Sequence, residues 1–285
     1  MRDVIRDSHP LVEFLFFFLV LGISMFLVNP LCMVFSLICA SCYSRRLGRK
    51  GFFLLSGFLA LAAVLNPLFT HEGATILLYF PDGNPLTLEA ILFGLNGALM
   101  LAALISWFGC MTAVLTADRF VYLFGRIAPA LSLFLSMTLR FVPRFREQMQ
   151  KTAEAHAASG APKTGKLRSA MEVFSATVTW ALENSVETSD SMKSRGYGLP
   201  GRTAYTTFRF GRRDSILLAA FLILGTGTIL CMAAGALNVQ FYPTVVFSVS
   251  GLTWVGALCF ALLCAAPVIL DLWEDFQWNL LQSKI

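Results

Sequence analysis

A short polar stretch, SDSMKSRGYGLPGR at residues 189–202, contains the residue types best suited to a specific contact in this chain. Arg195 lies between the small residues Ser194 and Gly196, so that a partner can approach its guanidinium closely. Arginine presents a planar set of donors to a carboxylate, and such charge-assisted hydrogen bonds are roughly twice as strong as neutral ones. We therefore interpret Arg195 as a docking residue for an acidic groove. The alternative is a cation that only complements the dipole at the end of a helix.

Residues that could carry catalysis or bind a metal are sparse and scattered. His9, His71 and His156 lie far apart in the sequence, and a lone CxxC pair, Cys39 and Cys42, is more typical of buried packing than of a metal or redox site. The chain has no GxxxxGK[ST] phosphate loop, so any ATP hydrolysis must be supplied by a partner. We expect a chain without catalytic residues, a metal site or a cofactor of its own, and without a nucleic-acid partner.

The composition is that of a membrane protein. Hydrophobic residues make up 56% of the chain and charged residues only 14%, against about 25% charged residues in soluble domains. Several uncharged stretches reach the roughly 20 residues that a helix needs to cross a bilayer. The sequence predicts an all-α integral membrane protein with about six transmembrane helices and two long cytoplasmic coupling helices.

The predicted spans are residues 11–28, 31–43, 51–69, 88–113, 216–237 and 245–270. The second has 13 residues, or about 20 Å at 1.5 Å per residue, and whether it crosses fully stays open.

The positive charges predict the orientation of these spans. All 22 Lys and Arg lie within residues 1–6, 45–50 and 119–213 or at position 284, and none lies within 70–87 or 238–244. Because cytoplasmic loops carry the excess of Lys and Arg, we expect both termini in the cytoplasm and the two uncharged segments outside. The outer stretch ILLYFPDGNPLTLE alternates apolar residues about a Pro-Asp-Gly-Asn turn and predicts a small β-hairpin.

The middle of the chain is polar and divides it into three parts, residues 1–116, 117–214 and 215–285. The middle part holds 15 of the 22 cations and 8 of the 17 acids. One interpretation is a solvated loop whose basic patch binds anionic lipid headgroups. Helical periodicity favours the other interpretation, a cytoplasmic platform of packed helices.

Two long helices are expected in this platform. The first covers residues 127–158, with Pro143 kinking it or ending its first part, and the Gly- and Pro-containing segment 159–166 separates it from the second. On the second helix, apolar residues recur in steps of four and three and form a stripe that we expect to be buried against protein. This stripe comprises Leu167, Met171, Phe174 and Val178. Gly196 is expected to end the second helix because glycine accepts a positive φ.

The motifs TLRFVPRFREQ, EAHAASG and SDSMKSRGYG, followed by FRFGRRD and two terminal spans, resemble the transmembrane T component of energy-coupling factor (ECF) transporters, the EcfT/CbiQ family. In that family two cytoplasmic coupling helices each end in a small-Arg-small tripeptide, and each arginine enters a groove on one of two ABC ATPase subunits. Ser194-Arg195-Gly196 matches the second tripeptide. The first is Ala158-Ser159-Gly160 here, with Ser159 in the place of the expected arginine, so one charged anchor is missing.

The resemblance implies a non-catalytic coupling and scaffold subunit of an ATP-driven importer. Such a subunit transmits the motion of the ATPases, which bind the ATP, to a small membrane-embedded S component that binds a vitamin or a transition metal. It implies a multi-pass protein in the cell membrane of a prokaryote. The substrate is carried by the S component and is not specified by this chain. The alternatives are a self-contained channel or secondary transporter, or an intramembrane enzyme, although the spans are poor in the ionisable groups that a transport pathway uses.

Overall fold

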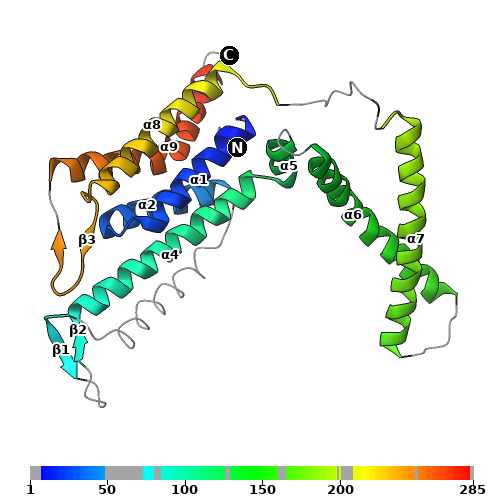
Figure 1. Ribbon diagram of the computed structural model, residues 1–285, viewed down its shortest axis with the longest axis horizontal. Helices are drawn as coiled ribbons and strands as arrows, with labels where there is room; N and C mark the ends of the chain where they lie inside the picture. The colour runs from blue at the N-terminus through cyan, green and yellow to red at the C-terminus, as the bar shows by residue number, and fades with distance from the viewer. Residues whose placement is uncertain are drawn as a thin grey trace. The chain divides into compact units, whose positions relative to one another are not determined.

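The computed structural model describes residues 8–48, 73–79, 85–125, 129–159, 165–197, 199, 208–247 and 250–282. The chain divides into two compact units. The first unit comprises Met1–Thr116 and Phe208–Ile285, and the second unit comprises Ala117–Thr207. Figure 1 shows the helices of both units and the hairpins of the first.

The first unit contains the apolar helices. They are α1 (Pro10–Phe26), α2 (Pro30–Arg46), α4 (Leu88–Val114), α8 (Arg212–Ala233) and α9 (Gly251–Gln282). By length and composition α4, α8 and α9 can cross a membrane, and α1 is a shorter apolar helix of 17 residues. An all-α membrane protein is thus confirmed. The predicted span 51–69 lies outside the described residues, so the number six stays a prediction.

Local sequence explains where these helices begin. Pro10 and Pro30 occupy the first positions of α1 and α2, where a missing N–H costs nothing. The side chains of the preceding residues cap the helices: His9 Nδ1 accepts from Leu11 N at 3.3 Å and Asn29 Oδ1 accepts from Leu31 N at 3.1 Å. Helix α2 has 17 residues rather than the 13 of the predicted span, because it continues through polar residues as far as Arg46.

An aromatic core holds the first unit together. Helix α1 packs on α4 and α8, α2 packs on α4 and α9, and α8 packs on α9. Phe16, Tyr43, Trp107 and Phe260 are fully buried. The ring of Trp107 meets the ring of Phe16 edge to face at 5.8 Å, and its Nε1 donates to Ser36 Oγ at 3.0 Å. Burial of these large side chains against one another joins helices that are distant in the sequence.

Charged side chains tie four helix ends of the first unit together. Arg46 at the end of α2 pairs with Asp275 of α9 at 3.0 Å, and Arg213 in the first turn of α8 pairs with Glu274 of α9. Asp214 Oδ1 accepts from the backbone N–H of His9 at 3.2 Å, which joins the start of α8 to the start of α1. These contacts place the beginnings of α1 and α8 and the ends of α2 and α9 at the same end of the unit.

Two small antiparallel hairpins also belong to this unit. β1 (Ile76–Tyr79) pairs with β2 (Pro85–Thr87), which confirms the predicted hairpin. β3 (Val239–Gln240) pairs with β4 (Val246–Phe247), and these strands were not predicted. The last span was predicted to begin at residue 245, but residues 246–247 form β4 and α9 begins at Gly251. The two hairpin regions are joined by a hydrogen bond in which Ala74 N donates to Pro243 O at 3.1 Å.

The second unit consists of α5 (Ala117–Gly125), α6 (Pro129–Ala158) and α7 (Lys166–Ser194). Helices α5 and α6 pack together, as do α6 and α7, where the rings of Phe141 and Trp180 stack at 6.2 Å. The two predicted long helices are confirmed. Pro143, however, lies inside the single 30-residue helix α6 and does not end it. Its position is exposed, so water can reach the backbone carbonyl that loses its donor.

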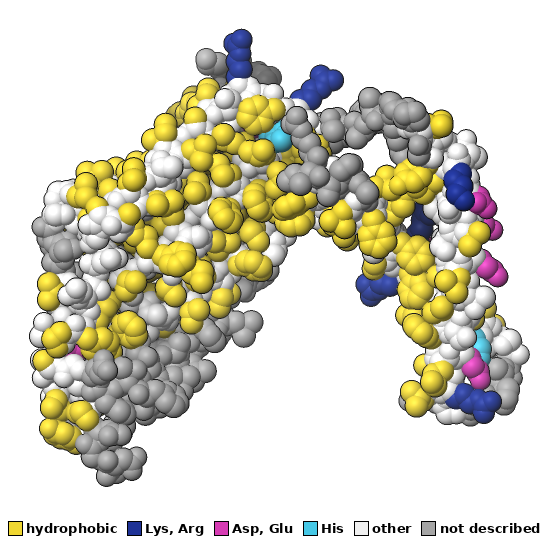
Figure 2. All heavy atoms as spheres, in the orientation of Figure 1, with side chains coloured by type: hydrophobic (Ala, Val, Ile, Leu, Met, Phe, Trp, Pro, Cys, Tyr) yellow, Lys and Arg dark blue, Asp and Glu magenta, His cyan; other side chains and the backbone are white. Residues whose placement is uncertain are grey.

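The surfaces of the two units differ in character. Figure 2 shows hydrophobic side chains over most of the visible face of the first unit, as expected for helices that contact lipid. On the second unit, charged side chains gather along α7 beside apolar ones. Its exposed apolar residues include Phe134, Met171 and Phe174. The second unit thus combines a charged surface with an apolar one.

Candidate functional site

The end of α7 has a well-defined backbone geometry. The helix ends at Ser194 with Arg195 as its C-cap, and Gly196 follows with φ of +81°. Gly196 N donates to Lys193 O and Tyr197 N donates to Met192 O, both at 3.0 Å. This pair of bonds is the Schellman motif, which requires a left-handed residue after the cap. The prediction that Gly196 ends this helix is confirmed.

Arg195 is exposed at this helix end. Ser194 Oγ donates to Ser191 O at 2.9 Å, so the hydroxyl turns back onto its own helix and leaves the guanidinium as the group available to a partner. The neighbouring cation, Lys193, lies 3.8 Å from Asp190. Within the described part of the chain, no acid pairs with Arg195. Arg195 is thus exposed between two small residues, at a helix end whose backbone is held by the Schellman motif.

The first tripeptide lies at the opposite end of α7. Ala158 is the last residue of α6, Ser159 follows it, and Gly160 lies outside the described residues. Ser159 Oγ donates to His156 O at 2.9 Å, so its hydroxyl completes a bond to its own helix. Helix α7 has 29 residues, or about 43 Å at 1.5 Å per residue. The two tripeptides therefore form two separate sites.

The predicted apolar stripe of α7 is mostly exposed. The exposed fractions are 78% for Leu167, 66% for Met171 and 56% for Phe174, and Val178 is partly buried. The buried face is the adjacent one, where Val173 and Thr177 lie. Within the described residues this chain does not cover the stripe, and its burial against another protein stays a prediction. Thr177 satisfies its hydroxyl by donating to Val173 O at 2.7 Å, which allows this polar residue to be buried.

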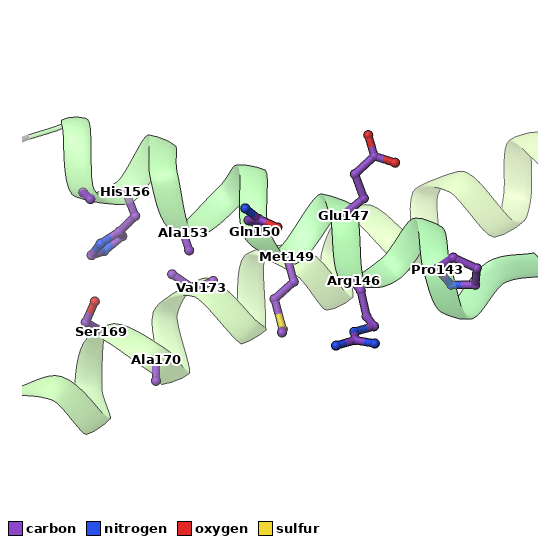
Figure 3. A pocket seen from close by; sticks show the side chains of 11 residues that line it. Pro143, Arg146, Glu147, Met149, Gln150, Ala153, His156, Ser169, Ala170 and Val173 are labelled. Atoms are coloured by element: carbon purple, nitrogen blue, oxygen red, sulfur yellow. The ribbon is translucent and has the colours of Figure 1, made fainter. Parts of the chain in front are cut away.

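A groove of about 880 Å³ runs between α6 and α7 (Figure 3). From α6 it is lined by Arg146, Glu147, Gln150 and His156, and from α7 by Ser169, Ala170 and Val173, among others. His156 and Ser169 point into the space between the helices. At the edge of the groove, hydrogen bonding and charge attraction from Lys151 Nζ, 2.8 Å away, lower the pKa of the Glu147 carboxyl.

A cross-helix contact at this groove was missed from the sequence. His156 Nε2 of α6 lies 3.0 Å from Glu172 Oε2 of α7, and Arg168 Nε donates to Glu172 Oε1 at 3.3 Å. The only sequence signal was the spacing of four between Arg168 and Glu172, which says nothing about the opposite helix. These groups bind and orient one another, and their arrangement is suited to recognition of a charged partner.

Comparison with known proteins identifies the family. Residues 1–205 match the model of the family described as cobalt transport protein, CbiQ, and because this match covers more than half of the chain, the chain belongs to that family. The matched region includes both tripeptides, at the ends of α6 and α7. The predicted resemblance to T components of ECF transporters is confirmed, and the protein is a membrane component of a transporter.

Two relatives are named as ECF transporter transmembrane proteins, EcfT. The protein from Bacillus selenitireducens is 26% identical over 190 residues, which cover 61% of this chain and 70% of the relative. The protein from Lactobacillus helveticus is 33% identical over 100 residues, which cover 33% of this chain and 36% of the relative. The similarity to the second relative thus spans about a third of either protein.

Proposed function

We propose that this chain is the coupling and scaffold subunit of an ATP-driven ECF-type importer. Two ABC ATPase subunits bind and hydrolyse the ATP, and a small S component binds the vitamin or transition metal to be taken up. This chain transmits the ATPase motion to the S component and contributes no chemistry of its own. The observation that carries the proposal is the exposed Arg195 on the capped tip of α7.

The mechanism follows from the stiffness of α7. Arg195 enters an acidic groove of one ATPase subunit, and closure of the ATPases on ATP moves this groove. A continuous helix of 29 residues carries the displacement along its length. The mostly exposed stripe of Leu167, Met171, Phe174 and Val178 contacts the S component and reorients it. Apolar surface of this kind suits a sliding contact, because its interactions are not directional.

The orientation in the cell membrane is part of the proposal. The end of the first unit with the pairs Arg46–Asp275 and Arg213–Glu274 faces the cytoplasm, and both termini lie there. The hairpins lie outside, in segments without Lys or Arg. This orientation agrees with the positive-inside rule, by which cytoplasmic segments carry the excess of Lys and Arg.

Substitution of Arg195 tests the proposed docking. Arg195→Ala leaves a carboxylate of the partner buried and unpaired, which costs about 2 to 5 kcal/mol, or roughly 30-fold to several thousand-fold in ATPase affinity. Uptake should be lost and ATPase subunits should dissociate during purification, while membrane insertion is unchanged. Arg195→Lys should restore only part of the affinity because lysine lacks the planar fork.

Lys193→Ala is the matched control. Lys193 is a cation in the last turn of the same helix and complements the dipole in the same way, but it is paired with Asp190. If the two alanine variants bind the ATPases equally well, Arg195 acts only on the helix and the docking proposal is wrong. Transport by the purified chain alone in proteoliposomes would favour a self-contained channel or transporter instead.

A further inference from the structure

Glu172 forms the centre of a three-residue cluster where the end of α6 meets the start of α7. One carboxylate oxygen of Glu172 lies 3.0 Å from His156 Nε2 and the other accepts from Arg168 Nε at 3.3 Å. The side chain of His156 is 26% exposed, that of Glu172 43%, and that of Arg168 73%. The exposure therefore increases outward along the cluster and is greatest at the guanidinium.

The position of Arg168 is poor for the stability of α7. The N-terminus of a helix carries partial positive charge and favours acids, yet the first turn of α7 contains no acidic residue. Arg168 precedes Glu172 by four residues, and an i,i+4 pair is stronger when the acid comes first. An exposed pair of this kind also contributes little to folding. Local helix stability thus does not account for an arginine at this position.

The cluster does fix the direction of the Arg168 side chain. Glu172 engages it through Nε alone. Among the residues that the structure describes, neither terminal guanidinium nitrogen of Arg168 has a hydrogen-bond or ion-pair partner. The two Nη atoms are thus held ready for a second carboxylate, which arginine binds with two parallel hydrogen bonds.

This arginine lies beside the site whose own arginine is missing. His156 is three residues before Ser159, and its contact with Glu172 joins the last turn of α6 to the first turns of α7. Ser159 uses its hydroxyl within its own helix. We propose that Arg168, oriented by Glu172 and His156, replaces the missing anchor and enters an acidic groove of the second ATPase subunit. This inference rests on the function proposed above.

The charges around the cluster favour a protein groove over a lipid surface. Anionic membranes are bound by clusters of about four to eight Lys and Arg. The charges along the end of α6 and the start of α7 are mixed, because Glu147, Glu154 and Glu172 alternate with the cations Lys151 and Arg168. A mixed surface lacks the dense positive charge by which proteins bind anionic headgroups, whereas a single oriented arginine fits one acidic groove.

The test measures binding of the purified ATPase pair to the full-length chain in nanodiscs with its S component. Arg168→Ala should raise the dissociation constant for the ATPase pair at least about 30-fold. Ser159→Arg added to that variant should restore much of the affinity, since it returns a cation to the original position. Lys151→Ala is the control, because Lys151 is an exposed cation of α6 paired with Glu147, and it should change little.

Glu172 is tested as a positioning residue by a double-mutant cycle. Glu172→Gln should weaken ATPase binding several-fold in the wild-type chain and have no further effect in the Arg168→Ala chain. Equal effects in both backgrounds would mean that Glu172 only stabilises the helices, and the proposed orientation of Arg168 would be wrong.

The outcomes separate this inference from the proposed function. If Arg195→Ala weakens ATPase binding and Arg168→Ala does not, the docking function stands and the replacement anchor is wrong. If neither variant matters, the proposed function itself is wrong. If Arg168→Ala leaves ATPase binding intact but lowers binding of the chain in detergent to phosphatidylglycerol vesicles, the partner is a lipid headgroup and the inference is overturned.

Discussion

At the scale of single residues, Gly196 determines how Arg195 is presented. Its φ of +81° lies in the left-handed region, and a Cβ atom there would come within 3.1 Å of Leu199 Cδ1. Residues with a Cβ pay roughly 1 to 2 kcal/mol for this conformation. Gly196→Leu should therefore disturb the Schellman motif, widen the helix tip and reduce the recovery of ATPase subunits with the chain. Pull-down from membranes measures that recovery.

Gly196→Asn separates the conformation from the size of the residue, because asparagine tolerates the left-handed region better than leucine does. This variant should retain more ATPase than Gly196→Leu, and faster amide exchange at residues 196 and 197 should accompany the loss in the leucine variant. Full recovery of the complex with leucine at position 196 would contradict a narrow groove around Arg195.

At the scale of elements, close packing of α8 on α9 depends on Gly256. A Cβ at this position would lie 2.8 Å from Cys231 Cβ and 3.0 Å from Leu237 Cδ1, and the first of these atoms cannot move without the backbone. Gly256→Ala should thus destabilise the first unit by about 1 to 3 kcal/mol, the usual cost of overpacking. A lower midpoint of thermal unfolding in detergent would show it.

Gly97→Ala in α4 is the matched control, because nothing lies within 4 Å of the position its Cβ would take. Alanine is also a better helix former than glycine, so this variant should be neutral or slightly more stable. Equal losses of stability in the two variants would mean that helix packing at Gly256 is not the cause.

At the scale of the whole molecule, the proposed orientation predicts which surfaces are reached from outside the cell. In a chain without its native cysteines, Ala74→Cys and Thr244→Cys lie at exposed positions of the hairpin regions and should react with a membrane-impermeant maleimide in intact cells. Thr188→Cys, exposed on α7, should react only after permeabilisation. The reverse pattern would place the charged helix ends outside and overturn the orientation.

Local properties of the sequence were sufficient for the apolar helices, the hairpin of β1 and β2, the end of α7 at Gly196 and the small residues beside Arg195. Each depends on the length of an apolar run, a turn sequence or the φ of one residue, and none requires a distant partner. The tertiary structure alone decided that Val173 and Thr177, rather than the Leu167 stripe, face α6. Apolar periodicity cannot distinguish neighbouring faces of a helix when both carry small or apolar residues. It also decided that α6 continues through Pro143. The contact between Glu172 and His156 likewise needed the structure, because it depends on how α6 and α7 pack.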